Sequence, residues 1–172
     1  MGESQDSRPS GGLSGLDVPF ASYKKLAFCL LDIFKIMDIL TKEKLDLHIQ
    51  KAQTLIDSDA YEEAVDELNE ALKIDSRDLA ALYGKGCALN ELGRYEEALK
   101  VLVEVLVIDS KSVMALNSIG YALDKLNRHS EAVAAFEEAL KINSKDELTL
   151  QNADIAFRNF VKYCLEMIIG KK

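Results

Sequence analysis

Side chains that could take part in acid/base chemistry are present, but their spacing does not assemble a catalytic site. Adjacent carboxylates recur at Glu62–Glu63, Glu96–Glu97 and Glu137–Glu138, and paired acids are the groups that general acid/base catalysis uses. Each pair falls at the start or on the outer side of a segment with helical periodicity. Acids there stay solvated and interact favourably with the helix dipole. The sequence therefore predicts solvated helix faces and no enzyme activity.

Metal and redox chemistry are not expected either. The two histidines, His48 and His129, are far apart in the sequence, and neither lies next to a cysteine. The three cysteines, Cys29, Cys87 and Cys164, are an odd number without paired spacing. This pattern is typical of free thiols in a reducing compartment rather than of a zinc site or a disulfide framework. We expect no metal, no cofactor and a cytoplasmic location.

A repeat with a fixed period organises most of the chain. Ala64, Ala98 and Ala132 are each 34 positions apart and stand at the same place in three similar stretches. A constant period of this length indicates one supersecondary unit that is copied and stacked. The three stretches are Tyr61–Ser76, Tyr95–Ser110 and His129–Ser144.

The repeated unit reads as a helical hairpin. In the first unit, apolar periodicity predicts one helix from Leu45 to Asp57 and a second from Tyr61 to Ile74. Between the two helices of each unit, one position holds a residue type that tolerates a left-handed backbone; it is occupied by Asp59, Gly93 and Asn127. Before the next unit, one position holds a good helix N-cap; it is occupied by Asp78, Ser112 and Asp146.

Small residues recur where the two helices of a hairpin are expected to cross. They are Ala52, Gly86 and Gly120 in the first helices, opposite Ala64, Ala98 and Ala132 in the second helices. Small side chains at a crossing allow two helix backbones to approach closely.

These marks resemble the tetratricopeptide repeat (TPR), a helix–turn–helix with a small residue in its first helix and a Tyr-x-x-Ala opening in its second. Three copies are expected, at residues 45–78, 79–112 and 113–146. The resemblance implies an all-α fold, a TPR superhelix with an extra N-terminal helix and a long C-terminal capping helix. The chain departs from the family in having Ser76, Ser110 and Ser144 in place of the usual proline, and His48, Leu82 and Leu116 in place of a large aromatic residue.

The segments outside the repeats have different characters. Residues 1–19 are rich in Ser, Gly, Asp and Pro and are predicted to form a flexible tail. Residues 20–42 are predicted to form an amphipathic helix, with Thr41 capping a new helix from Lys42. Asp32, Lys35 and Asp38 interrupt its apolar run, so no membrane span is expected. Residues 147–169 are predicted to be a capping helix over the last repeat.

The TPR resemblance implies a concave face lined by the first helices. The residues expected to bind a partner there are Ile49, Gln53, Tyr83, Cys87, Asn90, Met114, Asn117, Tyr121 and Asp124, with Leu148 and Gln151 continuing the strip. Some TPR adaptors grip a chaperone's terminal carboxylate with basic residues along this groove. No matching position here is basic, and a carboxylate clamp needs cations, so that activity is not transferred.

Two functions remain open at this point. The leading hypothesis is a non-catalytic protein–protein interaction module that binds a partner peptide or helix in the concave groove. The alternative is a self-associating scaffold, such as a homodimer, whose terminal apolar helices form the interface. A net charge of −8, concentrated in the repeats, disfavours nucleic acid as a partner. Peripheral membrane attachment through residues 20–41 is disfavoured because that helix is not rich in basic residues.

Overall fold

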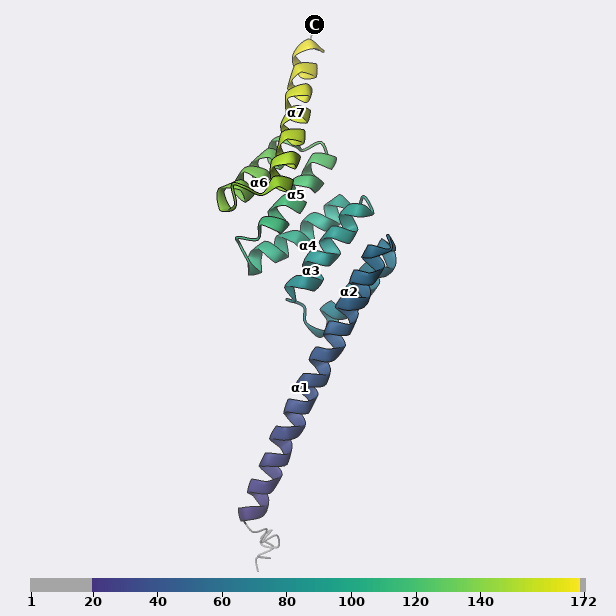
Figure 1. Ribbon diagram of the computed structural model, residues 1–172, viewed down its shortest axis with the longest axis vertical. Coiled ribbons are helices and arrows are strands. Elements are labelled where there is room, and N and C mark those ends of the chain that lie inside the picture. The colour runs from purple at the N-terminus through teal and green to yellow at the C-terminus, as the bar shows by residue number, and fades with distance from the viewer. Residues whose placement is uncertain (1–19, 171–172) are drawn as a thin grey trace, which may run out of the picture. The chain divides into compact units, whose positions relative to one another are not determined.

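The computed structural model describes residues 20–170, which form seven α-helices and no strand (Figure 1). The predicted tail, residues 1–19, lies outside the described residues. The all-α prediction is confirmed. The helices are α1 (Phe20–Asp57), α2 (Tyr61–Ile74), α3 (Leu79–Glu91), α4 (Tyr95–Ile108), α5 (Val113–Lys125), α6 (His129–Ile142) and α7 (Glu147–Ile169).

The chain divides into two units between Leu40 and Thr41. The first unit contains the N-terminal part of α1. The second unit contains the rest of α1 and the six helices that follow it, in which α2 packs on α3, α3 on α4, α4 on α5, α5 on α6 and α6 on α7. The C-terminal part of α1 contacts α2 through Ala52 and Leu68, so each helix of the second unit meets its sequence neighbour, as expected of stacked hairpins.

The turns within the hairpins have the predicted left-handed backbone. The φ angles are 59° at Asp59, 72° at Gly93 and 58° at Asn127. This region of backbone space is strained for most residues but is open to Gly, Asn and Asp. The three residue types repeated at 34-residue spacing thus end the first helix of each hairpin and reverse the chain.

The predicted N-caps are also confirmed. Asp78 accepts a hydrogen bond from the backbone N–H of Ala81 at 2.8 Å, and Ser112 accepts one from Ala115 at 3.4 Å. Asp146 accepts from the N–H of Thr149 at 2.9 Å. Each bond satisfies a backbone donor that has no partner within its own helix.

The helix crossings at the small residues are tight. A Cβ built on Gly86 would lie 2.5 Å from Leu102, and one built on Gly120 would lie 2.7 Å from Phe136. The glycines therefore leave room for the large side chains of the second helices, Leu102 and Phe136. The alanines expected opposite the small residues, Ala64, Ala98 and Ala132, are fully buried in the core.

The predicted break at Thr41 is wrong, because α1 runs without interruption from Phe20 to Asp57. Threonine is a good N-cap only where the preceding helix stops. This stretch contains no glycine or proline to stop it. The first helix of the first repeat is therefore the C-terminal part of a 38-residue helix.

Candidate functional site

The first helices of the hairpins α3–α4 and α5–α6, together with α7, line a hollow of about 210 Å³. Five of the residues predicted to bind a partner meet there: Tyr83, Cys87, Asn90, Asn117 and Tyr121. We call this space the central hollow. Its remaining lining residues are Glu91, Ser118, Leu148 and Asn152.

Hydrogen bonds between neighbouring first helices fix the walls of the central hollow. Asn152 of α7 donates to the side-chain oxygen of Asn117 on α5 at 3.1 Å. The amide nitrogen of Asn90 on α3 donates to the backbone carbonyl of Ser118 on α5, also at 3.1 Å. The Cys87 sulfur lies 3.8 Å from the Ser118 hydroxyl. These contacts join two successive repeats and the capping helix α7, and they hold the lining side chains in place before any ligand arrives.

The central hollow has little charge. Burial, with a contribution from the nearby Cys87, raises the pKa of Tyr83 to about 12. Burial also raises the pKa of the Cys87 thiol, so both groups are neutral at neutral pH. Glu91 is acidic, and none of the lining residues is Lys or Arg.

One polar atom in the wall lacks a partner. Asn90 is 4% exposed, and within the described residues its side-chain oxygen makes no hydrogen bond. Leaving a buried acceptor unpaired costs about 1–3 kcal/mol. A hydrogen-bond donor at this point would therefore be favourable.

Three other predicted residues have different environments. Ile49 is partly buried and packs against a core cluster that contains Ala52 and Leu68. Gln53 is exposed, and its amide donates to Asp57 one helical turn later at 2.9 Å. Met114 is 61% exposed at the start of α5 but does not line the central hollow.

Asp124, the ninth predicted residue, is held by contacts with two other helices. Its carboxylate lies 2.7 Å from the His129 imidazole on α6 and accepts a hydrogen bond from Asn159 on α7 at 2.9 Å. The Asp124 side chain is only 14% exposed. It ties α5 to the next two helices and lines a separate hollow of about 350 Å³ with Lys162 and Tyr163.

The sequence analysis missed three lining residues, Glu91, Ser118 and Asn152. Ser118 and Asn152 are 34 positions apart and occupy one repeat position, which is held by Gly84 in the preceding unit. A systematic reading of every first-helix position at this spacing would have found them. No comparable signal marks Glu91, the last residue of α3.

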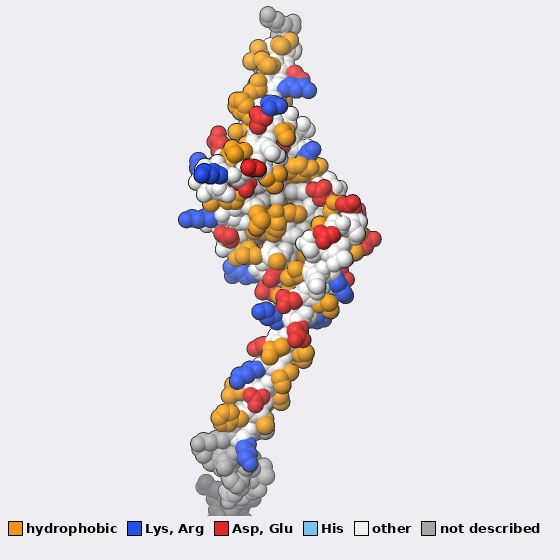
Figure 2. Space-filling model, viewed as in Figure 1, with side chains coloured by type: hydrophobic (Ala, Val, Ile, Leu, Met, Phe, Trp, Pro, Cys, Tyr) orange, Lys and Arg blue, Asp and Glu red, His pale blue; other side chains and the backbone are white. Residues whose placement is uncertain are grey.

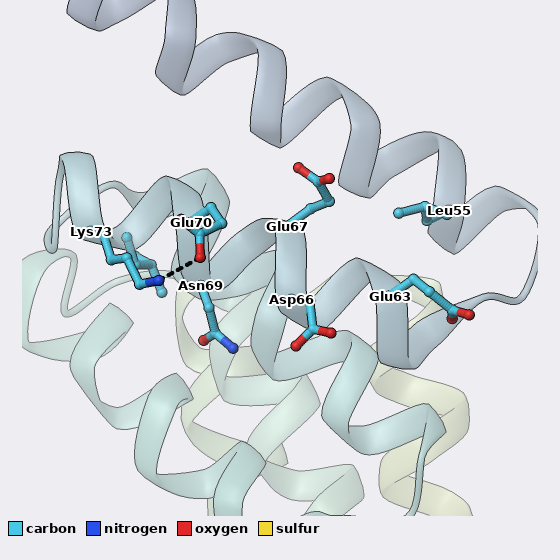
Figure 3. Close-up of a pocket in the computed structure, with 8 residues that line it drawn as sticks. Leu55, Glu63, Asp66, Glu67, Asn69, Glu70 and Lys73 are labelled. Atoms are coloured by element: carbon cyan, nitrogen blue, oxygen red, sulfur yellow. Dashed lines mark hydrogen bonds and ion pairs between the residues drawn. The ribbon is translucent and has the colours of Figure 1, made fainter.

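A second, larger hollow of about 1000 Å³ lies beside α2 (Figure 3). Its walls carry Glu63, Asp66, Glu67 and Glu70, so the surface is acidic. Glu67 and Glu70 already have partners. Glu67 lies 2.6 Å from the His48 imidazole, and Glu70 pairs with Lys73, whose hydrogen bond lowers the Glu70 pKa. The arrangement is that of a solvated, ion-paired helix face.

Among residues 20–170, no group of three or more His, Cys, Asp or Glu side chains is placed to hold a metal ion. Over the same residues, no helix is both long enough and apolar enough to cross a membrane.

Comparisons with known proteins agree with the repeat pattern. Two family models, both described as tetratricopeptide repeat, match residues 55–115 and 113–146, which together are more than half of the chain. No curated protein matches the chain.

Solved structures with the same fold are similar at low sequence identity. The Arabidopsis OM64 TPR domain has a TM-score of 0.65 and 22% identity, over 67% of this chain and 96% of that one. The second TPR domain of human RPAP3, in complex with the HSP70 peptide SGPTIEEVD, has a TM-score of 0.64 and 17% identity, over 67% and 97%. The Sgt2 TPR domain from Aspergillus fumigatus has a TM-score of 0.65 and 18% identity, over 74% and 83%. The hairpins, their turns and the family models agree: the chain belongs to the tetratricopeptide repeat family.

Proposed function

We propose that this chain is a non-catalytic protein-interaction module that binds a peptide segment of a partner protein in the central hollow. The observation that carries the proposal is that five residues from two different repeats, Tyr83, Cys87, Asn90, Asn117 and Tyr121, meet in one hollow. Half-buried aromatic rings with amide groups beside them are typical of interaction surfaces. The RPAP3 domain of similar fold, solved with a bound peptide, supports peptide binding as the mode.

The chemistry of the hollow favours an uncharged or basic segment. The RPAP3 complexes contain the peptides SGPTIEEVD and SRMEEVD, which are acidic at their C-terminal ends. Here the lining residues offer Glu91 and no cation, and a carboxylate without a cationic partner binds poorly in a partly buried site.

The same proposal extends to partner class and compartment. An acidic chain with a net charge of −8 repels a phosphate backbone, which argues for protein rather than nucleic acid as the partner. Cys29, Cys87 and Cys164 are free thiols, which supports binding in a reducing, cytoplasmic environment.

The test uses Leu148 and Leu150, two exposed leucines on α7, of which only Leu148 lines the central hollow. Random peptides would be selected on the full chain by phage display, and the dissociation constant of the best synthetic peptide would be measured by fluorescence anisotropy. We expect selected peptides poor in Asp and Glu. Leu148→Glu should weaken binding at least tenfold, whereas the matched control Leu150→Glu should leave it unchanged.

Two results would overturn this proposal. Equal binding by the wild type and Leu148→Glu would place the peptide outside the central hollow. Tight binding of SRMEEVD, in preference to the selected peptides, would show that the hollow accepts an acidic tail and that the charge argument is wrong.

A further inference from the structure

The N-terminal part of α1 exposes a dense apolar surface. Every large apolar side chain from Phe28 to Leu40 is between 47% and 68% exposed (Figure 2). Exposed apolar side chains that adjoin one another usually mark an interaction site. No residue from Phe28 to Leu40 lines the central hollow, so this surface has no part in the proposed function.

The spacing of four of these residues is that of a coiled coil. Leu30, Ile33, Met37 and Leu40 follow one another at steps of three, four and three residues. We call them the α1 seam. In the sequence the same alternation continues to Leu26 on one side and, through Lys44, to Leu47 on the other. Apolar residues repeating every 3.5 positions form a straight stripe along a helix only when the helix winds around another helix.

The charges of this segment lie on the other side of the helix. Asp32, Lys35 and Asp38 fall outside the seam on the helical wheel, and Lys35 lies 4.0 Å from Asp32. The seam therefore carries no charge, and the opposite side stays solvated. Phe34 and Ile36, both exposed, flank the seam and widen its apolar surface.

A lipid surface is a poor match for this helix. From Phe28 to Leu40 the segment holds two acids and one lysine, whereas helices that lie on membranes are usually rich in Lys and Arg. A helix can lie on a flat lipid surface without a strict 3.5-residue spacing of its apolar side chains. Packing along another helix in a coiled coil does require that spacing.

The other exposed apolar helix offers that period only in interrupted form. On α7 the exposed residues Phe157, Val161 and Ile168 follow a 3.5-residue spacing. Cys164, at the position between Val161 and Ile168, is half-buried, and the charged Asp154 stands at the position before Phe157, so the exposed stripe is not continuous. A helix with the matching seam is present in every other copy of this chain. We propose that the α1 seam packs against the α1 seam of a second copy, as a coiled coil.

The test compares two double variants of the full chain. Ile33→Asp with Leu40→Asp places two acids on the seam. Leu31→Asp with Ile39→Asp places the same acids on the other side of the same helix, where the side chains are 55% and 56% exposed against 52% and 57%. Molar mass would be measured by light scattering on size-exclusion fractions over a hundredfold range of concentration.

We expect the wild type and the Leu31/Ile39 variant to have at least twice the chain mass of 19.1 kDa. The Ile33/Leu40 variant should have the mass of one chain. The milder pair Ile33→Ala with Leu40→Ala, which preserves helix propensity, should weaken association at least tenfold. Circular dichroism would confirm that all variants remain helical.

A wild type that is monomeric at every concentration would overturn the proposal, as would equal loss of association in both Asp variants. A monomeric wild type that co-sediments with phosphatidylcholine–phosphatidylserine vesicles would assign the α1 surface to lipid and would also overturn it.

Discussion

The hairpin α5–α6 and the last helix α7 share the sequence pattern of a first helix, but α7 continues as a single long helix instead of forming a hairpin. Leu89 on α3, Leu123 on α5 and Phe157 on α7 occupy one repeat position, 34 residues apart. The two leucines are 1% and 7% exposed, but Phe157 is 54% exposed. The first two helices are each covered by the second helix of their own hairpin, whereas within residues 20–170 no second helix follows α7. The burial of this position is therefore a property of the hairpin rather than of the first helix.

Two residues explain why α7 does not become a hairpin. The position that reverses the chain at Asn127, with φ of 58°, is held in α7 by Val161, and a β-branched side chain strongly disfavours a left-handed backbone. The position of Gly120, which receives Phe136, is held in α7 by Asp154. Without a turn residue or a packing glycine the helix continues to Ile169, and its apolar side stays exposed.

The sharpest contrast is expected from two phenylalanines. Phe136 is 1% exposed and fills the space against Gly120, so Phe136→Ala should lower the free energy of unfolding by about 3–5 kcal/mol. Phe157→Ala on α7 should change it by less than about 0.5 kcal/mol. Urea denaturation followed by circular dichroism measures both. Similar losses for the two variants would mean that α7 is covered after all.

Glycine packing gives the next largest difference. A Cβ on Gly120 would lie 2.7 Å from two carbon atoms of the Phe136 ring, so Gly120→Ala should destabilise by about 1–3 kcal/mol despite the better helix propensity of alanine. Asp154→Ala at the equivalent position of α7 should be close to neutral. The same denaturation experiment compares them. A stabilised Gly120→Ala would show that the crossing has room to spare.

At the turn residue Asn127, the effect of a substitution on stability should depend only on how well the new residue adopts a left-handed backbone. Asn127→Ala forces a side chain with no local hydrogen bond into a left-handed backbone and should cost about 1 kcal/mol. Asn127→Gly should be neutral or slightly stabilising. If alanine and glycine at this position gave equal midpoints of thermal unfolding, turn conformation would not control where the hairpin reverses.

The smallest effect is expected at the cap of α7. Hydrogen bonds from the hydroxyl and the backbone N–H of Thr149 lower the pKa of Asp146 in the folded chain. The stabilisation is therefore present above the unfolded-state pKa of about 4 and is lost as the pH falls through the lower folded-state value. Asp146→Ser, which copies the cap at Ser112, should flatten this acid-side loss in the midpoint of thermal unfolding. An unchanged pH profile would contradict the assignment.

Local chemistry predicted the fold more completely than it predicted the site. The turns at Asp59, Gly93 and Asn127 and the three N-caps depend on residue type at one position, and all were predicted correctly. The continuous α1 was missed because a threonine cannot end a helix that has no breaker.

Long-range contacts explain why Asp124 and Ile49 do not line the central hollow. Asp124 was placed on the concave strip, but its partners, His129 and Asn159, come from two other helices. Ile49 packs with Leu68 of α2 in the same way, through a contact that periodicity does not specify. The five residues that do meet in the central hollow lie on α3 and α5. Each of these helices packs between two helices of the array, α3 between α2 and α4 and α5 between α4 and α6.

The central claim, that a peptide binds between the first helices, is tested most directly by mapping amide chemical shifts. A ¹⁵N-labelled full chain would be titrated with the selected peptide. We expect the largest shifts at Tyr83, Asn117, Tyr121 and Asn152, which surround the central hollow. Shifts centred on Val103 and Val107, the exposed apolar residues of α4, would contradict it and place the partner on the second helices.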